Sequence, residues 1–173
     1  MFEIKTGFYD SRDFYQFITS LGPQTIRQFD QFVDMNDEDD VWNKMYNDRH
    51  NFYGILDDEL IAYGFLQQFP KKKNIVSLGM VMSDKHHGHG YGKQMYTHVV
   101  DWGLQRYTKI WSAVYEDNDR VLHIHKSLGF SLEGIFTDEL NDGRAIYSVA
   151  KFRDHWTSKV DKRLALVEKW NKI

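Results

Sequence analysis

The sequence has no cysteine, which excludes a disulfide framework, a thiolate nucleophile and a zinc–thiolate site. It also lacks an excess of positive charge, since 22 Lys and Arg face 25 Asp and Glu for a net charge of −3. The basic footprint of a nucleic-acid-binding protein is therefore missing. No stretch approaches the roughly 18 apolar residues of a membrane span, and the start of the chain lacks the regions of a secretion signal. We therefore expect a cytoplasmic protein that binds neither nucleic acid nor a membrane.

Proline is rare, with two residues in 173, and neither a low-complexity linker nor an internal repeat divides the chain. A chain of this length can bury its own core as one domain. We predict that residues 1–153 form that domain and that residues 154–173 form a helical extension packed on it. Asp154 could cap this last helix, whose role is open, and its apolar positions recur on one face: Val160, Leu164, Val167 and Trp170.

Strand and helix signals alternate along the domain. Asp10 is placed to cap a helix through Leu21, with apolar residues at the spacing of one buried face. Pro23 marks the start of a helix over residues 24–35, and the acidic run 36–40 is a loop or a helix start leading into 41–46. Two later helices are predicted over residues 93–107 and 119–128. Strands are predicted over residues 2–6, 52–56, 60–68, 75–82, 110–114, 131–136 and 145–152.

The stretch from His87 to Gly92, His-Gly-His-Gly-Tyr-Gly, is the most informative feature of the chain. It follows a strand-like run and leads into a helix-like one. Glycine lets a backbone turn tightly and approach a ligand closely, and the first turn of a helix leaves N–H groups without intrahelical partners. Together these features indicate an anion site, most naturally for phosphate. The pattern is neither the Gly-x-Gly-x-x-Gly of a dinucleotide site nor a Walker loop.

A second informative segment lies downstream, where Asn118 to Phe130 reads Asn-x-x-Val-Leu-x-Ile-His-Lys-x-Leu-Gly-Phe. The glycine loop resembles the acetyl-coenzyme A signature of the GNAT N-acetyltransferases, Arg/Gln-x-x-Gly-x-Gly/Ala. Gly90 and Gly92 match this signature, and His87 stands where Arg or Gln is usual. The downstream segment is similar to a second block of the same family, and the two blocks follow one another in the expected order.

The resemblance implies a mixed α/β fold, in which helices flank a central, mostly antiparallel sheet of about seven strands. Two central strands, over residues 75–82 and 110–114, would splay apart and hold the pantetheine arm of the co-substrate acetyl-coenzyme A in the gap. This arm is an extended amide chain, so it can bond free backbone groups as another strand would. Met82 and Ser83 would offer such groups. The pyrophosphate would be held by His87, Gly88, His89, Gly90, Tyr91, Gly92 and Lys93.

Acetyl transfer to an amine needs a donor for the developing oxyanion and a proton for the leaving thiolate. The resemblance implies that the Met82 backbone N–H is the oxyanion donor. His125 stands where many relatives have a tyrosine that acts as general acid, and imidazole can donate a proton. The alternative is that His125 packs beside Leu122 and Leu128. Asn118 would brace the strand end and contact cofactor or substrate, or would simply cap the next helix.

The base that deprotonates the amine is not identified. Relatives often carry a glutamate on the first splayed strand, but the aligned position here holds Ser77, which is too weak a base to replace a carboxylate. A water chain or another residue must then act. The candidates near the strand ends are Tyr115, Glu116, Asp138, Glu139 and Tyr147.

Two other classes of function compete with an enzyme of this kind. His86, His87 and His89 are close enough for two of them to bind a transition metal. A zinc site needs three or four ligands of fixed geometry, however, and neither cysteines nor an HExxH helix is present, so we predict no metal. The second alternative is a non-catalytic module that binds acyl-coenzyme A, which the missing glutamate and the unusual His87 would favour.

We predict an acetyl-coenzyme A-dependent acyltransferase that moves the acetyl group directly to a primary amine of a small molecule, such as a polyamine or an amino sugar. The acidic segments 37–40 and 57–59 could draw a cationic amine toward a cleft, although solvated loops have the same composition. A protein N-terminus is the alternative acceptor. The segment after Gly134 resembles the branch that acetylates ribosomal proteins, but Phe136 stands where that branch has Arg. The chain could also form a homodimer.

Overall fold

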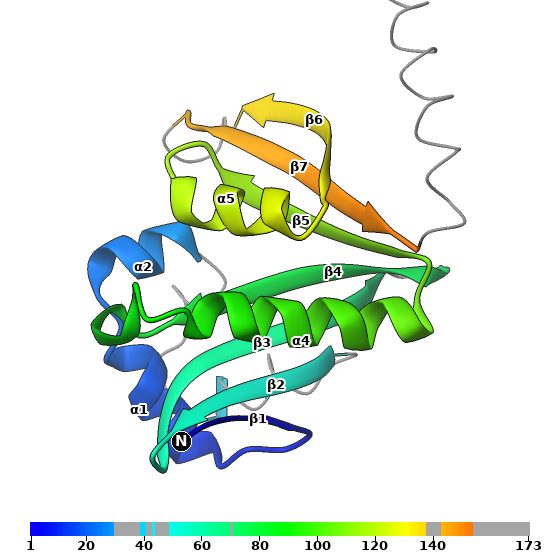
Figure 1. Ribbon diagram of the computed structural model, residues 1–173. Coiled ribbons are helices and arrows are strands. Elements are labelled where there is room, and N and C mark those ends of the chain that lie inside the picture. Colours follow the sequence, from blue (N-terminus) through cyan, green and yellow to red (C-terminus); the bar gives the residue numbers. More distant parts are fainter. Residues whose placement is uncertain (30–38, 41–42, 44–48, 70, 138–142, 154–173) are drawn as a thin grey trace, which may run out of the picture.

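A computed structural model describes residues 1–29, 39–40, 43, 49–69, 71–137 and 143–153. Its seven-stranded sheet has the order β1-β2-β3-β4-β5-β7-β6 (Figure 1). The strands are β1 (Phe2–Thr6), β2 (Arg49–Leu56), β3 (Glu59–Phe69), β4 (Lys72–Met82), β5 (Lys109–Tyr115), β6 (Ser131–Thr137) and β7 (Ala145–Phe152). The helices are α1 (Ser11–Thr19), α2 (Pro23–Gln28), α4 (Tyr91–Arg106) and α5 (Asp119–Ser127), with a short 3-10 helix η2 (Asp84–His86). Among the helices described, none has the length and apolar character needed to cross a membrane.

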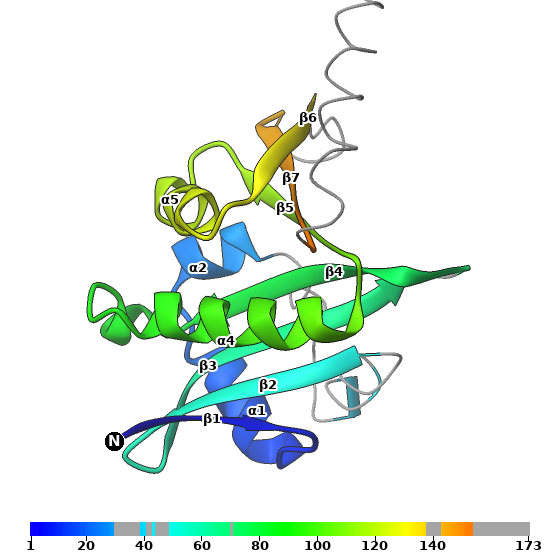
Figure 2. The ribbon, with the colours of Figure 1, turned by 45° about the vertical axis from the view of Figure 1, so that its right-hand side comes forward.

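Helices cover both faces of the sheet, with α4 and α5 on one face and α1 on the other (Figure 1 and Figure 2). Because successive side chains of a strand point to opposite faces, each central strand contributes to two cores. The core beneath α1 includes Phe14, Phe17, Tyr63, Phe65 and Val81. The core beneath α4 and α5 includes Leu66, Val76, Met95, Val99 and Ile110.

Two neighbouring strands in the middle of the sheet splay apart, as the family resemblance implies. Within the described sheet β4 and β5 are the parallel pair, and all other pairs are antiparallel. The β4–β5 ladder runs only from Ile75–Lys109 to Ser77–Trp111. Beyond these pairs, the last residues of both strands have no ladder between them. The expected fold class is therefore confirmed, including the position of the gap.

The first two helices show where sequence patterns are less exact. Asp10 caps α1 as predicted and accepts hydrogen bonds from the backbone N–H groups of Arg12 and Asp13 at 2.9 and 3.2 Å. The helix predicted over 24–35 instead ends at Gln28. Phe29 leaves the helical backbone, with φ −139° and ψ 71°, and its ring packs edge-on against Phe65 at 6.2 Å. Most of the segment 36–46 and all of 154–173 lie outside the described residues.

Candidate active site

The free edge of β4 presents backbone groups to the gap between the splayed strands. In an antiparallel pair, the N–H and C=O groups of successive residues point alternately toward the partner strand and away from it. The Ser83 N–H donates to the Ile61 carbonyl at 2.8 Å, so Ser83 is directed toward β3. By alternation, Met82 and Met80 direct their backbone groups away from β3 and into the gap.

Two side-chain contacts agree with this alternation. The Leu78 carbonyl accepts a hydrogen bond from Ser112 Oγ at 3.2 Å across the gap, and the Met82 carbonyl lies 3.2 Å from His87 Nε2. Met82 therefore has the direction that an extended ligand requires. Ser83 does not offer its N–H, because that group is bonded to Ile61. Met80, which the sequence reasoning missed, has the same direction as Met82, and knowing the strand register would have identified it.

The glycine loop turns sharply into the N-terminus of α4. Gly88 and Gly90 have φ angles of 83° and 85°, a region that glycine adopts without steric cost. Gly90 is the N-cap of α4 and has no side chain to bond the first-turn N–H groups, which leaves them available to an anion. Among the predicted loop residues, His87 and Gly92 line the larger of two cavities at the gap. The residues that do not line it are Gly88, His89, Gly90, Tyr91 and Lys93.

His87 is half-buried and folds back on β4. Burial, followed by the nearby positive charge of Arg120, lowers the pKa of His87 below its ordinary value. The ring is therefore neutral at pH 7, with the Nε2–H placed to donate to the Met82 carbonyl. Its Nδ1 lies 3.9 Å from Asp84 Oδ1. Arg120, at the start of α5, lines the same cavity and brings a positive charge near His87.

Two cavities meet at the gap. The larger, of about 600 Å³, lies among α2, the loop after β4 and the first turns of α4 and α5. The smaller, of about 210 Å³, is lined by both splayed strands. Its walls include Tyr96 and Val121 from the α4–α5 side of the sheet and Phe65 and Trp111 from the other side, so it passes through the gap. The cavities share Gln28, Phe29, Met80, Tyr96, Asn118 and Val121.

Asn118 lies where β5 gives way to α5. Its side-chain oxygen accepts a hydrogen bond from the Val121 N–H at 3.3 Å and caps the helix. It also lines both cavities. The two alternatives predicted for this residue, a helix cap and a contact with ligand, are therefore compatible in one position.

Helix α2 lies beside the gap, and each of its two ends is bonded by a carboxylate. After β4, Asp84 accepts hydrogen bonds from the Gly22 N–H at 2.8 Å and from Thr25 Oγ1 at 2.6 Å. Burial alone would raise the pKa of Asp84, but the hydrogen bonds from Thr25 and Gly22 outweigh it and lower that pKa. The carboxylate is therefore ionised at neutral pH.

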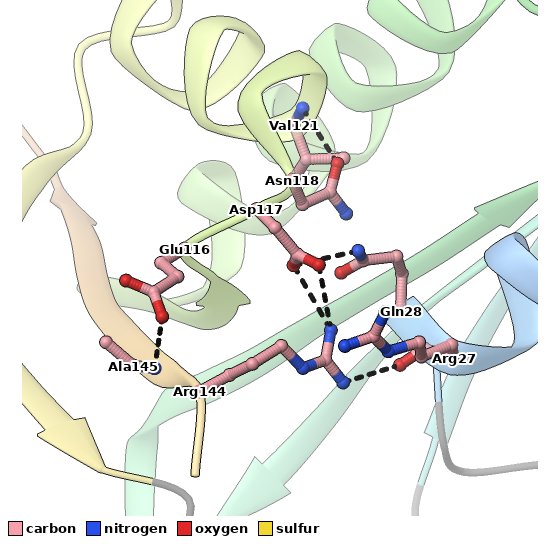
Figure 3. A network of polar contacts seen from close by, with 8 residues as sticks. All are labelled: Arg27, Gln28, Glu116, Asp117, Asn118, Val121, Arg144 and Ala145. Carbon is pink, nitrogen blue, oxygen red and sulfur yellow. Dashed lines mark hydrogen bonds and ion pairs between the residues drawn. The ribbon is translucent and has the colours of Figure 1, made fainter. Parts of the chain in front are cut away.

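The other end of α2 is held by a network that Figure 3 shows around Asp117, which follows β5. Gln28 Nε2 donates to Asp117 Oδ1 at 2.9 Å, and Arg144 Nη1 donates to the same oxygen at 3.1 Å. Arg144 Nη2 also donates to the Arg27 carbonyl at 3.2 Å. Hydrogen bonds from Gln28 and Arg144 lower the pKa of Asp117. This network fixes one wall of the larger cavity.

His125 lines neither of the two cavities. Its side chain is 1% exposed, its Nδ1 lies 2.9 Å from the Val121 carbonyl, and its ring packs edge-on against Tyr96 and Phe130. The carbonyl requires Nδ1 to carry the proton, so Nε2 is unprotonated in the neutral ring. Burial lowers the pKa of His125 to about 4. The acid role stays a prediction, and these features favour the packing alternative.

Tyr96, on α4, lines both cavities and was not singled out from the sequence. Burial raises its pKa far above the ordinary value of a phenol, so its hydroxyl stays protonated at neutral pH. The signal that could have identified it is helical spacing, because Tyr96 lies about one turn after Gly92.

The histidines around the glycine loop form no metal site in the described part of the chain. No group of three or more His, Asp or Glu side chains there is arranged to hold a metal ion.

Comparisons with solved structures place this architecture among acetyltransferases. Spermidine N-acetyltransferase from Vibrio cholerae, in complex with CoA and spermine, aligns with a TM-score of 0.74 at 13% identity, over 88% of this chain and 96% of that chain. The ribosomal-protein-S18-alanine N-acetyltransferase from Escherichia coli aligns with a TM-score of 0.70 at 15% identity, over 88% and 94%. A GNAT acetyltransferase from Bacillus anthracis gives 0.71 at 16% identity, over 89% and 99%. At these identities the likeness shows the fold alone.

Sequence comparison gives the family. A search of curated proteins finds no match to the chain. The sequence model described as Acetyltransferase (GNAT) family matches residues 13–130, which is more than half of the chain and includes both motifs and the splayed strands. The chain therefore belongs to the GNAT acetyltransferase family.

Proposed function

We propose that the protein transfers the acetyl group of acetyl-coenzyme A directly to the primary amine of a small molecule. The observation that carries this proposal is the gap between β4 and β5, where unpaired strand backbone meets two joined cavities. A direct transfer needs both substrates bound together, and two cavities meeting at one gap can hold them together.

The cofactor fits the residues on one side of this gap. The amide groups of its pantetheine arm match the backbone groups that Met80 and Met82 direct away from β3. The N-terminus of α4 and the Arg120 guanidinium offer donors and positive charge to the pyrophosphate. His87 fixes the Met82 carbonyl and holds the loop against the strand end.

The chemistry that acetyl-coenzyme A supplies is an activated thioester. The amine nitrogen forms the new C–N bond while the C–S bond breaks. One proton leaves the amine and one is taken up by the thiolate. The Met82 N–H donates a hydrogen bond to the carbonyl oxygen as negative charge develops there. The Tyr96 side chain lines both cavities, and its hydroxyl, which stays protonated, donates a hydrogen bond to the departing sulfur.

The small-molecule assignment follows from the narrow space for the acceptor, about 210 Å³, within the gap. The acidic turn 57–59, considered above as an attractor of cationic amines, lies at the β2–β3 hairpin and lines neither cavity. Of the acidic segment 37–40, positions 37 and 38 lie outside the described residues, and Asp39 and Asp40 line neither cavity. The acceptor must therefore be inferred from the cavity itself.

Release of the coenzyme A thiol tests the proposed function. The full chain is incubated with acetyl-coenzyme A and a panel of primary amines, and thiol release is followed against a reaction without amine. Amine-dependent release is expected. Calorimetric binding of coenzyme A with no amine-dependent release would instead support the non-catalytic module.

A further inference from the structure

We propose that the acceptor amine is carried on an apolar, ring-sized body and binds in the smaller cavity; this inference rests on the proposed N-acetyltransferase function. The smaller cavity is lined by β4 and β5 from their last ladder pair, Ser77–Trp111, onward. The rest of the lining consists of the polar side chains of Gln28 and Asn118 and of Phe29, Phe65, Tyr96, Val121 and Ile146. Its walls, charges and volume each indicate the same class of acceptor.

The part of the smaller cavity on the face opposite α4 is the acceptor side, because the cofactor enters from the other side of the gap. His87 and Gly92 of the glycine loop and Arg120 of α5 line the larger cavity. On β5, the side chains of Trp111, Ala113 and Tyr115 alternate with the buried Ser112 and Val114, so they point to the face opposite α4. An amine that attacks the acetyl group must approach from the side that the cofactor does not occupy. That side is the one lined by Trp111, Ala113 and Tyr115.

Aromatic side chains form much of this lining: Phe29, Phe65, Tyr96, Trp111 and Tyr115. The position of the Phe65 ring depends on a glycine beside it, Gly79. A Cβ at Gly79 would overlap the Phe65 ring, so glycine at this strand position lets the ring lie over the β4 backbone. Phe29 then packs on Phe65 as α2 ends. Such walls bind apolar surface and flat rings by contact.

The charge of the lining disfavours a polyamine. None of the described residues that line the smaller cavity is a carboxylate. In addition, two of its rings already contact guanidinium groups, with Arg49 4.2 Å from the Phe65 ring centroid and Arg144 3.7 Å from that of Tyr115. A ring that holds one cation is a poorer partner for a second. An acceptor with several ammonium groups would therefore lose water without gaining a carboxylate partner from this lining.

The aromatic part of the lining favours the neutral form of the amine, although none of the described residues that line this cavity is a carboxylate base. Burial against aromatic walls disfavours the charged form of an ammonium group and lowers its pKa. The ammonium group therefore loses one proton to water before attack, and the neutral amine that results is the nucleophile. A second proton leaves the nitrogen as the amide forms. A cavity of about 210 Å³ is smaller than the roughly 300–1,000 Å³ pockets that enclose drug-sized ligands, and the end of the pantetheine arm would share it at Met80. An acceptor no larger than one ring on a short chain therefore fits.

An acceptor panel tests the inference directly. The full chain is assayed for thiol release with 2-phenylethylamine, spermidine and glucosamine. We expect kcat/KM for 2-phenylethylamine to exceed that for either of the others by at least about 10-fold, the discrimination typical of apolar contacts. A preference for spermidine or glucosamine would overturn the inference while leaving the proposed function intact. No release with any amine would overturn the proposed function itself.

A matched pair of variants at Ala113 tests whether the charge of the cavity sets the preference. Ala113 is exposed and lines the cavity between Trp111 and Tyr115, so a larger polar side chain fits without displacing the core. Ala113→Asp should lower the ratio of 2-phenylethylamine to spermidine kcat/KM by about 10-fold. Ala113→Asn, which has nearly the same shape without the charge, should leave the ratio closer to that of the wild type. Equal changes in the two variants would refute the role of charge.

Discussion

The burial of His125 predicts a loss of stability at low pH that replacing this residue should reduce. In the unfolded chain an imidazole titrates near about 6.5, whereas in the fold burial lowers the pKa of His125 to about 4. Above pH 6.5 the ring is neutral in both states and contributes no pH dependence. Between pH 6.5 and 4 the unfolded chain binds a proton that the folded protein does not. Stability therefore falls as pH falls, by up to about 3 kcal/mol for a difference of roughly 2.5 pKa units.

The measurement is the free energy of unfolding by urea at pH 7.5 and pH 4.5, for the wild type and for His125→Phe. Phenylalanine fills a similar volume between Tyr96 and Phe130, so the variant should lose about 2–3 kcal/mol less than the wild type over this range. Other titrating groups act in both proteins and cancel in the difference. His123→Phe, at an exposed position of the same helix, is the matched control and should behave as the wild type. Identical pH dependence in wild type and His125→Phe would show that His125 is not buried as a neutral ring.

Three further predictions concern the reaction and the cofactor. In steady-state assays, Tyr96→Phe should lower kcat by roughly 10²-fold with little change in KM for acetyl-coenzyme A, whereas His125→Phe should retain most of kcat. The reverse order would support His125 as the acid. Gly92→Asp places a negative charge in the larger cavity and should weaken coenzyme A binding by calorimetry, whereas Gly92→Ala, whose Cβ meets only the Met82 side chain at 3.8 Å, should bind normally. His87→Arg should keep or tighten coenzyme A binding, because Arg is always charged and bonds phosphate with two donors. Loss of binding both in this variant and in the wild type after chelation would indicate a metal at His87.

Features carried by local sequence could be predicted, and these were the strands, the Asp10 cap, the glycine loop and the Asn118 cap. Each depends on residues a few positions apart, where turn geometry and capping act. The extent of α2 could not be predicted, because Phe29 leaves the helix to reach Phe65 on a strand far along the chain. Likewise, the contacts of Asp117 with Gln28 and Arg144 join residues 89 and 27 positions apart. No local pattern encodes such pairs.

The position of the candidate site follows from one topological feature. The parallel strands β4 and β5 have their carboxyl ends at the same edge of the sheet, and the ladder between them stops before that edge. Asp84 and Asp117, which follow these ends, therefore come within reach of one short helix, and each bonds one end of α2. These contacts tie α2 to the ends of both splayed strands. Because this helix and the residue after it contribute Gln28 and Phe29 to both cavities, that part of the cavity walls is positioned by a single pair of carboxylates.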